Sequence, residues 1–369
     1  MKFAVIEYSS KTKKIWRHTN SRPNYVCDPI KEIDPTSFGC YVSALEGEHI
    51  PLTYFITGDE VNPIRKIYRK IIKRISGSWP TTYNIDYLGT FDALLVVYQI
   101  SDGHEMIAFV KKLRQLSPSV TIIGVPTQPY GILKNLWDEY PAKLSEIQDF
   151  MNCCDVFLTI VKSTQEIWQQ LTSKPVVYLP QPYPVEYALQ EWKARGAKSN
   201  VIFIAGITGR NNIVKGQIVA KKLQKKFPHY RIQMAQVPGM QLNTKELTGT
   251  VFDIVPFLPW RQHLAMLAKV VLVINTDYTF TRGRVQVDCA AVGTPSIGAN
   301  SDGQDDLFPK LPANKETSVE QLVLQGEQLL MDASYYDEVM RTAKERLRKY
   351  NYEESRKRIE DLVAAYKND

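Results

Sequence analysis

The sequence TDYTFTRGRVQVDCAAVGTPSIGANSDGQDDLFP, residues Thr276–Pro309, decides how this chain is organised. It predicts a polar loop, a short helix of small residues that begins near Gly283, a Gly-Thr-Pro turn, a brief apolar strand and an acidic loop. An apolar run, Val270–Asn275, ends just before it. In open α/β sheets, ligands bind beyond the carboxyl ends of strands, where helix N-termini leave N–H groups free. The stretch therefore predicts half of a ligand site.

The composition is that of a globular protein with room for two domains. The chain has 369 residues, of which 44% are hydrophobic and 23% charged. No apolar run approaches the roughly 18 residues that a membrane span needs, and the start of the chain lacks the apolar core of a signal peptide. The five cysteines lack metal-ligand spacing, which favours free thiols and a cytoplasmic location. The net charge of +7 indicates an anionic partner without choosing between phosphorylated substrates, anionic lipid and nucleic acid.

Strand patterns and helix patterns alternate along most of the chain, first from Lys2 to Leu179 and again from Asn200 onward. Such alternation indicates parallel sheets with helices on both faces. Within the first half, Ser163 is placed to cap the helix TQEIWQQL. We expect a two-domain α/β protein with a first domain at residues 1–183, a linker at 184–199 that begins within the proline-containing stretch LPQPYPVEYALQ, a second domain at 200–345 and a helical tail at 346–369.

The loop AGITGRNNIVKG, Ala205–Gly216, joins a predicted strand to a predicted helix. Gly206 and Gly209 permit close approach of a ligand to the backbone. Arg210 and Lys215 can meet a diphosphate, aided by the helix N-terminus. The loop matches neither the Walker pattern nor GxGxxG. The alternative is an ordinary turn with two solvated cations.

The segment Thr276–Pro309 supplies Arg282, Arg284 and Asp288. A carboxylate beyond a strand end can bind ribose hydroxyls. The polar, acidic loop 300–306 can hold sugar hydroxyls, although helix capping and a solvated loop would explain the same residues. Two cation-bearing loops at strand ends of one domain favour a nucleotide site.

Asp102 and His104 follow a predicted strand of the first half, where a helix begins. His104 can act as a base or hydrogen-bonding group that faces the cleft, or it can be structural. The sequence contains no HExxH or CxxC spacing and no GxSxG elbow. We therefore expect neither a metal nor another cofactor.

The most basic segment is NPIRKIYRKIIKRI, Asn62–Ile75, whose isoleucines repeat at helical spacing while the other face carries cations without acids. This pattern is typical of an amphipathic helix with a solvated face, and equally of a patch for a membrane surface or an acceptor phosphate. Interleaving of aromatic and basic residues along a groove is not evident, so nucleic acid is disfavoured. The candidate acceptor-binding residues are Lys66, Arg69, Lys70 and Lys73.

These motifs together resemble the GT-B glycosyltransferases, most closely the group 1 family of nucleotide-sugar-dependent enzymes. AGITGRNNIVKG resembles the family's Gly-Arg…Lys-Gly loop, and VDCAAVGTPSIGANSDGQDDLF resembles its Glu-Ala-x-Ala-x-Gly-x-Pro-Val segment. SALEGEHIPLTYF resembles an early helix-turn-strand of the family. The resemblance implies two Rossmann-like domains that face a central cleft, with C-terminal helices packed back on the first domain.

The chain departs from the family at one position. Members usually carry two glutamates separated by seven residues. Asp288 occupies the second place, which the resemblance assigns to the nucleotide ribose. Phe280 occupies the first, where the family uses a carboxylate to help hold the donor sugar. Arg282 and Arg284 can replace that carboxylate by binding phosphate or an acidic sugar.

The resemblance implies a glycosyltransferase that moves a sugar from a nucleoside-diphosphate sugar to an acceptor glycan, with a lipid-linked glycan as the favoured type. Arg210 and Lys215 would neutralise the leaving diphosphate without a metal, and the reaction would retain the anomeric configuration. If it inverts, Asp102 or His104 is the candidate base. A sugar-nucleotide epimerase of the same fold, or a non-catalytic binding protein, remains the alternative.

Overall fold

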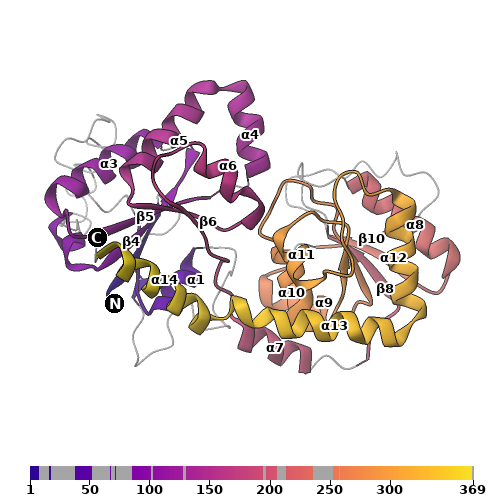
Figure 1. Cartoon of the computed structure of the whole chain (residues 1–369). Helices are drawn as coiled ribbons and strands as arrows, with labels where there is room; N and C mark the ends of the chain where they lie inside the picture. The colour runs from indigo at the N-terminus through magenta and orange to yellow at the C-terminus, as the bar shows by residue number, and fades with distance from the viewer. Residues whose placement is uncertain are drawn as a thin grey trace.

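The computed structural model describes residues 1–7, 16–17, 38–51, 67, 71, 85–100, 103–127, 130–193, 197–205, 213–235, 252–256 and 258–367. Figure 1 shows two lobes, each built around its own sheet. Several predicted residues lie outside the described part of the chain: Lys66, Arg69, Lys70, Lys73, Asp102, Gly206, Gly209 and Arg210.

The first domain is built on a seven-stranded sheet. Its strands are parallel except for the pairing of the first two in the spatial order. The long central strands are fully buried, which explains why they appear in the sequence as unbroken apolar runs. In spatial order the strands are β2 (Trp16–Arg17), β3 (Glu48–Pro51), β1 (Phe3–Glu7), β4 (Ala93–Tyr98), β5 (Thr121–Pro126), β6 (Val156–Thr159) and β7 (Val176–Tyr178).

Helices cover both faces of this sheet, as the alternating pattern predicts. α3 and α5 pack together on one face, and α1 lies on the other. The helices of this domain are α1 (Gly39–Leu45), α3 (Gly103–Leu116), α4 (Tyr130–Glu139), α5 (Pro141–Cys153) and α6 (Gln165–Gln169). The predicted cap is wrong: Thr164 is the N-cap of α6, and the Ser163 hydroxyl donates instead to Asp302 of the second domain at 3.3 Å.

The second domain holds a five-stranded sheet that is parallel throughout its described pairings. Its strands in spatial order are β10 (Asp253–Val255), β9 (Arg231–Ala235), β8 (Val201–Ile204), β11 (Leu272–Ile274) and β12 (Ser296–Ile297). α8 and α12 pack against each other, while α10 is surrounded by α7, α9, α11 and α13. These helices are α7 (Val185–Lys193), α8 (Ile213–Lys226), α9 (Trp260–Leu267), α10 (Arg284–Val292), α11 (Asp302–Leu307), α12 (Val319–Met331) and α13 (Ala333–Leu347).

Two predicted irregular segments contain helices. The expected linker 184–199 includes α7, and Val185 and Ala188 belong to the hydrophobic core of the second domain. The second domain therefore begins near Tyr183 rather than at residue 200. The expected acidic loop 300–306 includes most of α11, whose N-cap Ser301 accepts a hydrogen bond from the Gln304 amide.

The last helix, α14 (Tyr352–Lys367), returns to the first domain, whereas α12 and α13 pack on the second (Figure 1). Ile359 and Val363 join the core on the α1 side of the first sheet. Arg356 donates to the carbonyl of Ala44 at 2.7 Å and pairs with Glu46 at 2.8 Å. The expectation that C-terminal helices pack back on the first domain is confirmed for α14.

Ile359→Ala should lower the unfolding free energy of the first domain by about 2 kcal/mol. The side chain is buried, and the value is at the low end of the usual range because a surface helix can settle into the space. Urea unfolding followed by circular dichroism measures the change. The exposed neighbour provides the control: Glu360→Ala should change stability by less than about 0.5 kcal/mol. Equal effects of the two variants would contradict the packing of α14.

No helix in the described ranges is both long enough and apolar enough to cross a bilayer.

Candidate functional site

The candidate site is centred on the turn between β11 and α10. This turn packs closely against the start of α11. Gly283, the N-cap of α10, has φ of +80°, a conformation that glycine adopts without steric cost. A β-carbon there would lie 2.6 Å from the Gly303 Cα and 2.6 Å from the Ser301 Oγ. The close approach of these two backbones fixes where α10 begins.

Gly283→Ala should destabilise the second domain by about 2–3 kcal/mol, because it adds left-handed strain to a clash between backbones. In Gly303→Ala the new β-carbon would lie 2.6 Å from the Gly283 carbonyl oxygen. This substitution adds no left-handed strain, so it should lower the stability less than Gly283→Ala does. Thermal unfolding compares the two variants. A Gly283→Ala protein as stable as the parent would disprove this account of the turn.

Asp288 projects from α10 into the interior, where its side chain is only 2% exposed. One carboxylate oxygen, Oδ1, accepts hydrogen bonds from the Tyr183 hydroxyl at 2.6 Å and from the Trp260 indole nitrogen at 2.9 Å. The other, Oδ2, lies 3.4 Å from Arg284 Nε. The carboxylate therefore joins three parts of the chain in one buried network: α9, α10 and the crossover between the domains (residues 179–184).

The charge of Asp288 shifts the pKa values of two neighbouring side chains, Tyr183 and His263. Burial raises the pKa of the Tyr183 hydroxyl, and the adjacent carboxylate raises it further, so the phenol stays a donor. Burial lowers the pKa of His263, and Asp288 partly opposes that shift. The contact of Asp288 with a nucleotide ribose stays a prediction. The carboxylate already has three protein partners.

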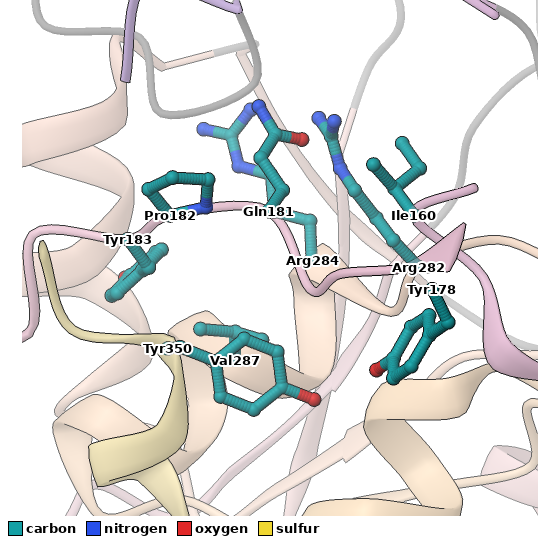
Figure 2. Close-up of a pocket in the computed structure, with 9 residues that line it drawn as sticks. All are labelled: Ile160, Tyr178, Gln181, Pro182, Tyr183, Arg282, Arg284, Val287 and Tyr350. Atoms are coloured by element: carbon teal, nitrogen blue, oxygen red, sulfur yellow. The ribbon is translucent and has the colours of Figure 1, made fainter. Parts of the chain in front are cut away.

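Arg282 and Arg284 line a small pocket between the two domains (Figure 2). Figure 2 shows their guanidinium groups and the Gln181 amide directed to the same side. Arg282 also acts on α1, because its positive charge partly opposes the upward pKa shift that burial imposes on Tyr41. Both cations line the pocket beside residues 181–183, and an anion between the domains would find both. The remaining lining residues are Ile160, Tyr178, Pro182, Tyr183, Val287 and Tyr350.

Lys215 lies beside a different pocket. Its Nζ donates to the Lys315 carbonyl at 3.2 Å and lies 5.0 Å from the ring centre of Tyr278. Partial burial lowers the pKa of this lysine. The sequence predicted one clamp of Lys215 with the two arginines. The structure instead divides these residues between two pockets, with Tyr278 and Phe280 lining the second and Arg282 and Arg284 the first.

The second pocket has a volume of about 860 Å³, within the range of small-ligand sites. Ser163 of the first domain forms part of its wall. The remaining lining residues come from the loops after β11 and β12, from α11, and from α12 with the loop before it.

Hydrogen bonds join the domains around these pockets. The Gly131 amide of α4 donates to the Thr279 carbonyl at 3.2 Å. Asp302, the first residue of α11, accepts from the Lys162 amide and the Ser163 hydroxyl. Burial raises the pKa of Asp302 to about 6, although these donors oppose the shift. The loops after β11 and β12 are therefore held against the first domain.

His104 is 88% exposed at the start of α3, with its Nε2 3.3 Å from the buried carboxylate of Glu146. Glu146 also accepts from the Tyr98 hydroxyl at 2.8 Å and from Lys143 at 3.1 Å. His104 is accessible and paired, so its role as a base stays a prediction. Within the described ranges, no three His, Cys, Asp or Glu side chains are grouped in a way that could hold a metal ion.

Sequence reasoning missed Tyr183 and Trp260. Both lie far from Asp288 in sequence and carry no motif, so their roles emerge only from the fold. Tyr278 was also missed, although it stands in the quoted loop two residues before Phe280. An aromatic side chain just beyond a strand end is the signal that could have identified it.

Comparison with solved structures finds the same two-domain arrangement at low sequence identity. Anabaena HepE in complex with UDP and glucose matches with a TM-score of 0.64 and 11% identity, over 99% of this chain and 100% of that one. The chain has the GT-B fold. The sucrose-phosphate synthase of Thermosynechococcus elongatus matches this GT-B chain with a TM-score of 0.62 and 12% identity, over 99% and 98% of the two chains.

A third matching structure is that of a longer protein. The pneumococcal O-GlcNAc transferase GtfA, in complex with UDP and GlcNAc, matches with a TM-score of 0.55 and 12% identity over 77% of this chain. This chain covers only 59% of GtfA. By sequence, no family model and no curated protein matches. Identities this low show the fold alone.

Proposed function

We propose that this protein is a glycosyltransferase that moves a sugar from a nucleoside-diphosphate sugar to an acceptor glycan. The observation that carries the proposal is the placement of Arg282 and Arg284, with the N-terminus of α10, in a pocket between the domains of a GT-B fold. A bound diphosphate meets cations and free helix N–H groups at such a place. The UDP in the HepE and GtfA structures makes a uridine nucleotide the first donor to test.

In the proposed reaction, an acceptor hydroxyl oxygen bonds to the anomeric carbon of the donor sugar. The bond from that carbon to the diphosphate oxygen breaks, and the hydroxyl proton passes to the departing phosphate. Lys215, Arg210 and the two pocket arginines supply positive charge to the leaving group, which is the main catalytic requirement of such a site. The reaction is proposed to be retaining and independent of a metal. The ribose is assigned to Asp288, with Gly206 and Gly209 allowing close approach of the diphosphate.

The acceptor is proposed to be a lipid-linked glycan, on the basis of the basic segment 62–75 in the sequence. Sedimentation with vesicles that contain anionic lipid tests this part. Binding at low salt that weakens as salt rises is expected. Failure to bind at low salt removes the membrane-associated acceptor and leaves sugar transfer itself unaffected.

The proposal as a whole is tested in two steps. Thermal unfolding with a series of nucleoside diphosphates should reveal one that stabilises the protein by mass action. Release of that nucleoside diphosphate from its sugar conjugate should then require an acceptor. A new sugar nucleotide formed without an acceptor would point to an epimerase, and stabilisation without turnover would point to a binding protein. Absence of both stabilisation and turnover would count against the proposed function.

A further inference from the structure

Among the residues that the structure describes, no arginine lines the larger of the two pockets, and its chemistry differs from that of the Arg282–Arg284 pocket. Its lining is rich in amides, hydroxyls and aromatic rings. Its two acids, Asp305 and Glu316, are balanced by Lys315 and the adjacent Lys215. The lining residues are Ser163, Tyr278, Phe280, Asn300, Asp305, Pro312, Ala313, Asn314, Lys315, Glu316, Thr317, Gln321, Leu324 and Gln325. A site of this composition suits an uncharged ligand with many hydroxyl groups better than a diphosphate.

Three buried polar atoms of this lining lack a hydrogen-bond partner among the described residues. They are the Tyr278 hydroxyl, Asn300 Oδ1 and Gln325 Oε1. Burying a polar group without a partner is costly, and native proteins rarely do so repeatedly in one place. Burial raises the pKa of Tyr278 to about 12, so its hydroxyl remains a donor at neutral pH. The three atoms belong to side chains of the pocket wall, so a ligand that reaches them would supply the missing partners.

The other polar atoms of these side chains fix their orientation. The Gln325 amide nitrogen donates to the Pro312 carbonyl at 2.9 Å, and the Asn300 amide nitrogen lies 3.5 Å from the Tyr278 carbonyl. Lys215 lies over the face of the Tyr278 ring. The unpartnered atoms are therefore presented by side chains that the fold already holds in place.

Phe280 adds a strained and exposed aromatic ring to the same wall. Its φ is +55°, a left-handed conformation that bulky residues rarely adopt, and its side chain is 39% exposed. A left-handed conformation at such a residue destabilises the folded state. A ring that is not buried in the core does not offset this cost by packing. An aromatic face beside donors and acceptors matches a sugar ring, which has apolar C–H faces and polar edges.

We propose that this pocket binds an uncharged sugar ring of the acceptor, with Phe280 and Tyr278 stacking on the ring and Asn300 and Gln325 accepting its hydroxyls. The inference deepens the proposed function and rests on it only in naming the sugar as acceptor. The 278–284 loop contributes to both pockets: Tyr278 and Phe280 line this one, and the two arginines line the other. Donor diphosphate and acceptor sugar would then meet at this loop. Phe280, which stands at the place of the family's first glutamate, would select the acceptor.

The test is direct binding of neutral sugars in the absence of nucleotide. The full chain is titrated with methyl glycosides of glucose, galactose, mannose and N-acetylglucosamine and with their common disaccharides, and saturation-transfer NMR reports binding. At least one sugar should bind. Phe280→Gly should lower its affinity about tenfold through loss of the ring face. Tyr278→Phe should lower it several-fold through loss of one hydrogen bond.

Both variants should fold at least as well as the parent. Glycine relieves the left-handed strain at position 280, and phenylalanine removes a buried hydroxyl that has no partner in the described structure. Met331→Ala, at an exposed position of α12 outside the pocket lining, is the matched control and should leave sugar affinity unchanged. Thermal unfolding of all three variants separates loss of binding from loss of structure.

The outcomes distinguish this inference from the proposed function. Stabilisation by a nucleoside diphosphate without binding of any sugar overturns the acceptor pocket alone. Sugar affinity that is unchanged in Phe280→Gly and Tyr278→Phe also overturns it. Sugar binding that depends on both aromatic residues, in a protein that no nucleotide stabilises, supports the pocket and overturns sugar transfer.

Discussion

Asp288→Ala is expected to lower the unfolding free energy of the second domain by about 3–5 kcal/mol, the largest stability effect that we predict for a single side chain. The substitution leaves the Tyr183 hydroxyl and the Trp260 indole N–H buried without their acceptor, and removes the Asp288 carboxylate from beside Arg284. Removing one member of a buried charged pair typically costs this much. Urea unfolding followed by tryptophan fluorescence reports the change, because Trp260 is part of the network.

Two milder variants separate the parts of this effect. Asp288→Asn keeps an oxygen that can accept from Tyr183 and Trp260 but removes the charge, so a loss of about 1–2 kcal/mol is expected. Tyr183→Phe removes one donor and should cost about 1 kcal/mol. If Asp288→Ala proves no more destabilising than Tyr183→Phe, the buried network is not what holds α10 in place.

The same variants test the ribose assignment. Asp288→Asn removes the charge that would hold ribose hydroxyls, so a folded Asp288→Asn protein should bind its nucleoside diphosphate several-fold more weakly if the assignment is right. Unchanged nucleotide affinity would leave Asp288 with a structural role alone. Isothermal titration at a temperature well below the unfolding transition measures this affinity.

The sequence predicted the architecture because its strands are apolar runs and its long helices are periodic, and both patterns reflect burial. Prediction failed where local composition concealed a helix. The prolines around Pro182 indicated a linker, yet Pro184 directly precedes α7, and proline is favourable where a helix begins. The acidic stretch at Asp302 indicated a loop, although Ser301 caps a helix there and acids favour its N-terminus.

The site was predictable only as far as it is local. The positions of Arg282, Arg284 and Asp288 beyond a strand end follow from spacing along one segment. Their partners do not, because Tyr183 is 105 residues from Asp288 and meets it only through the crossover. The division of the predicted cations between two pockets depends on how α8, which carries Lys215, lies relative to the loop that carries Arg282, and hydrophobic periodicity carries no information on that.

Lys215→Ala is expected to lower sugar-transfer turnover by about 100–1000-fold, the largest functional effect that we predict. Lys215 lies at the start of α8, where its partly buried ammonium faces the Lys315 carbonyl and the Tyr278 ring. In the proposed reaction, negative charge develops on the departing diphosphate, and removal of one fixed donor to such a charge typically costs two to three orders of magnitude. Lys215→Arg keeps a positive charge and should retain more activity than the alanine variant.

The matched control lies on the same helix. Lys222 pairs with Glu320 at 2.6 Å on the surface, and exposed pairs of this kind contribute little, so Lys222→Ala should change neither turnover nor stability appreciably. Steady-state assays of nucleoside diphosphate release, with unfolding curves for each variant, make the comparison. Turnover by Lys215→Ala equal to that of Lys222→Ala would remove Lys215 from the proposed mechanism. The leaving-group charge would then fall to Arg282 and Arg284.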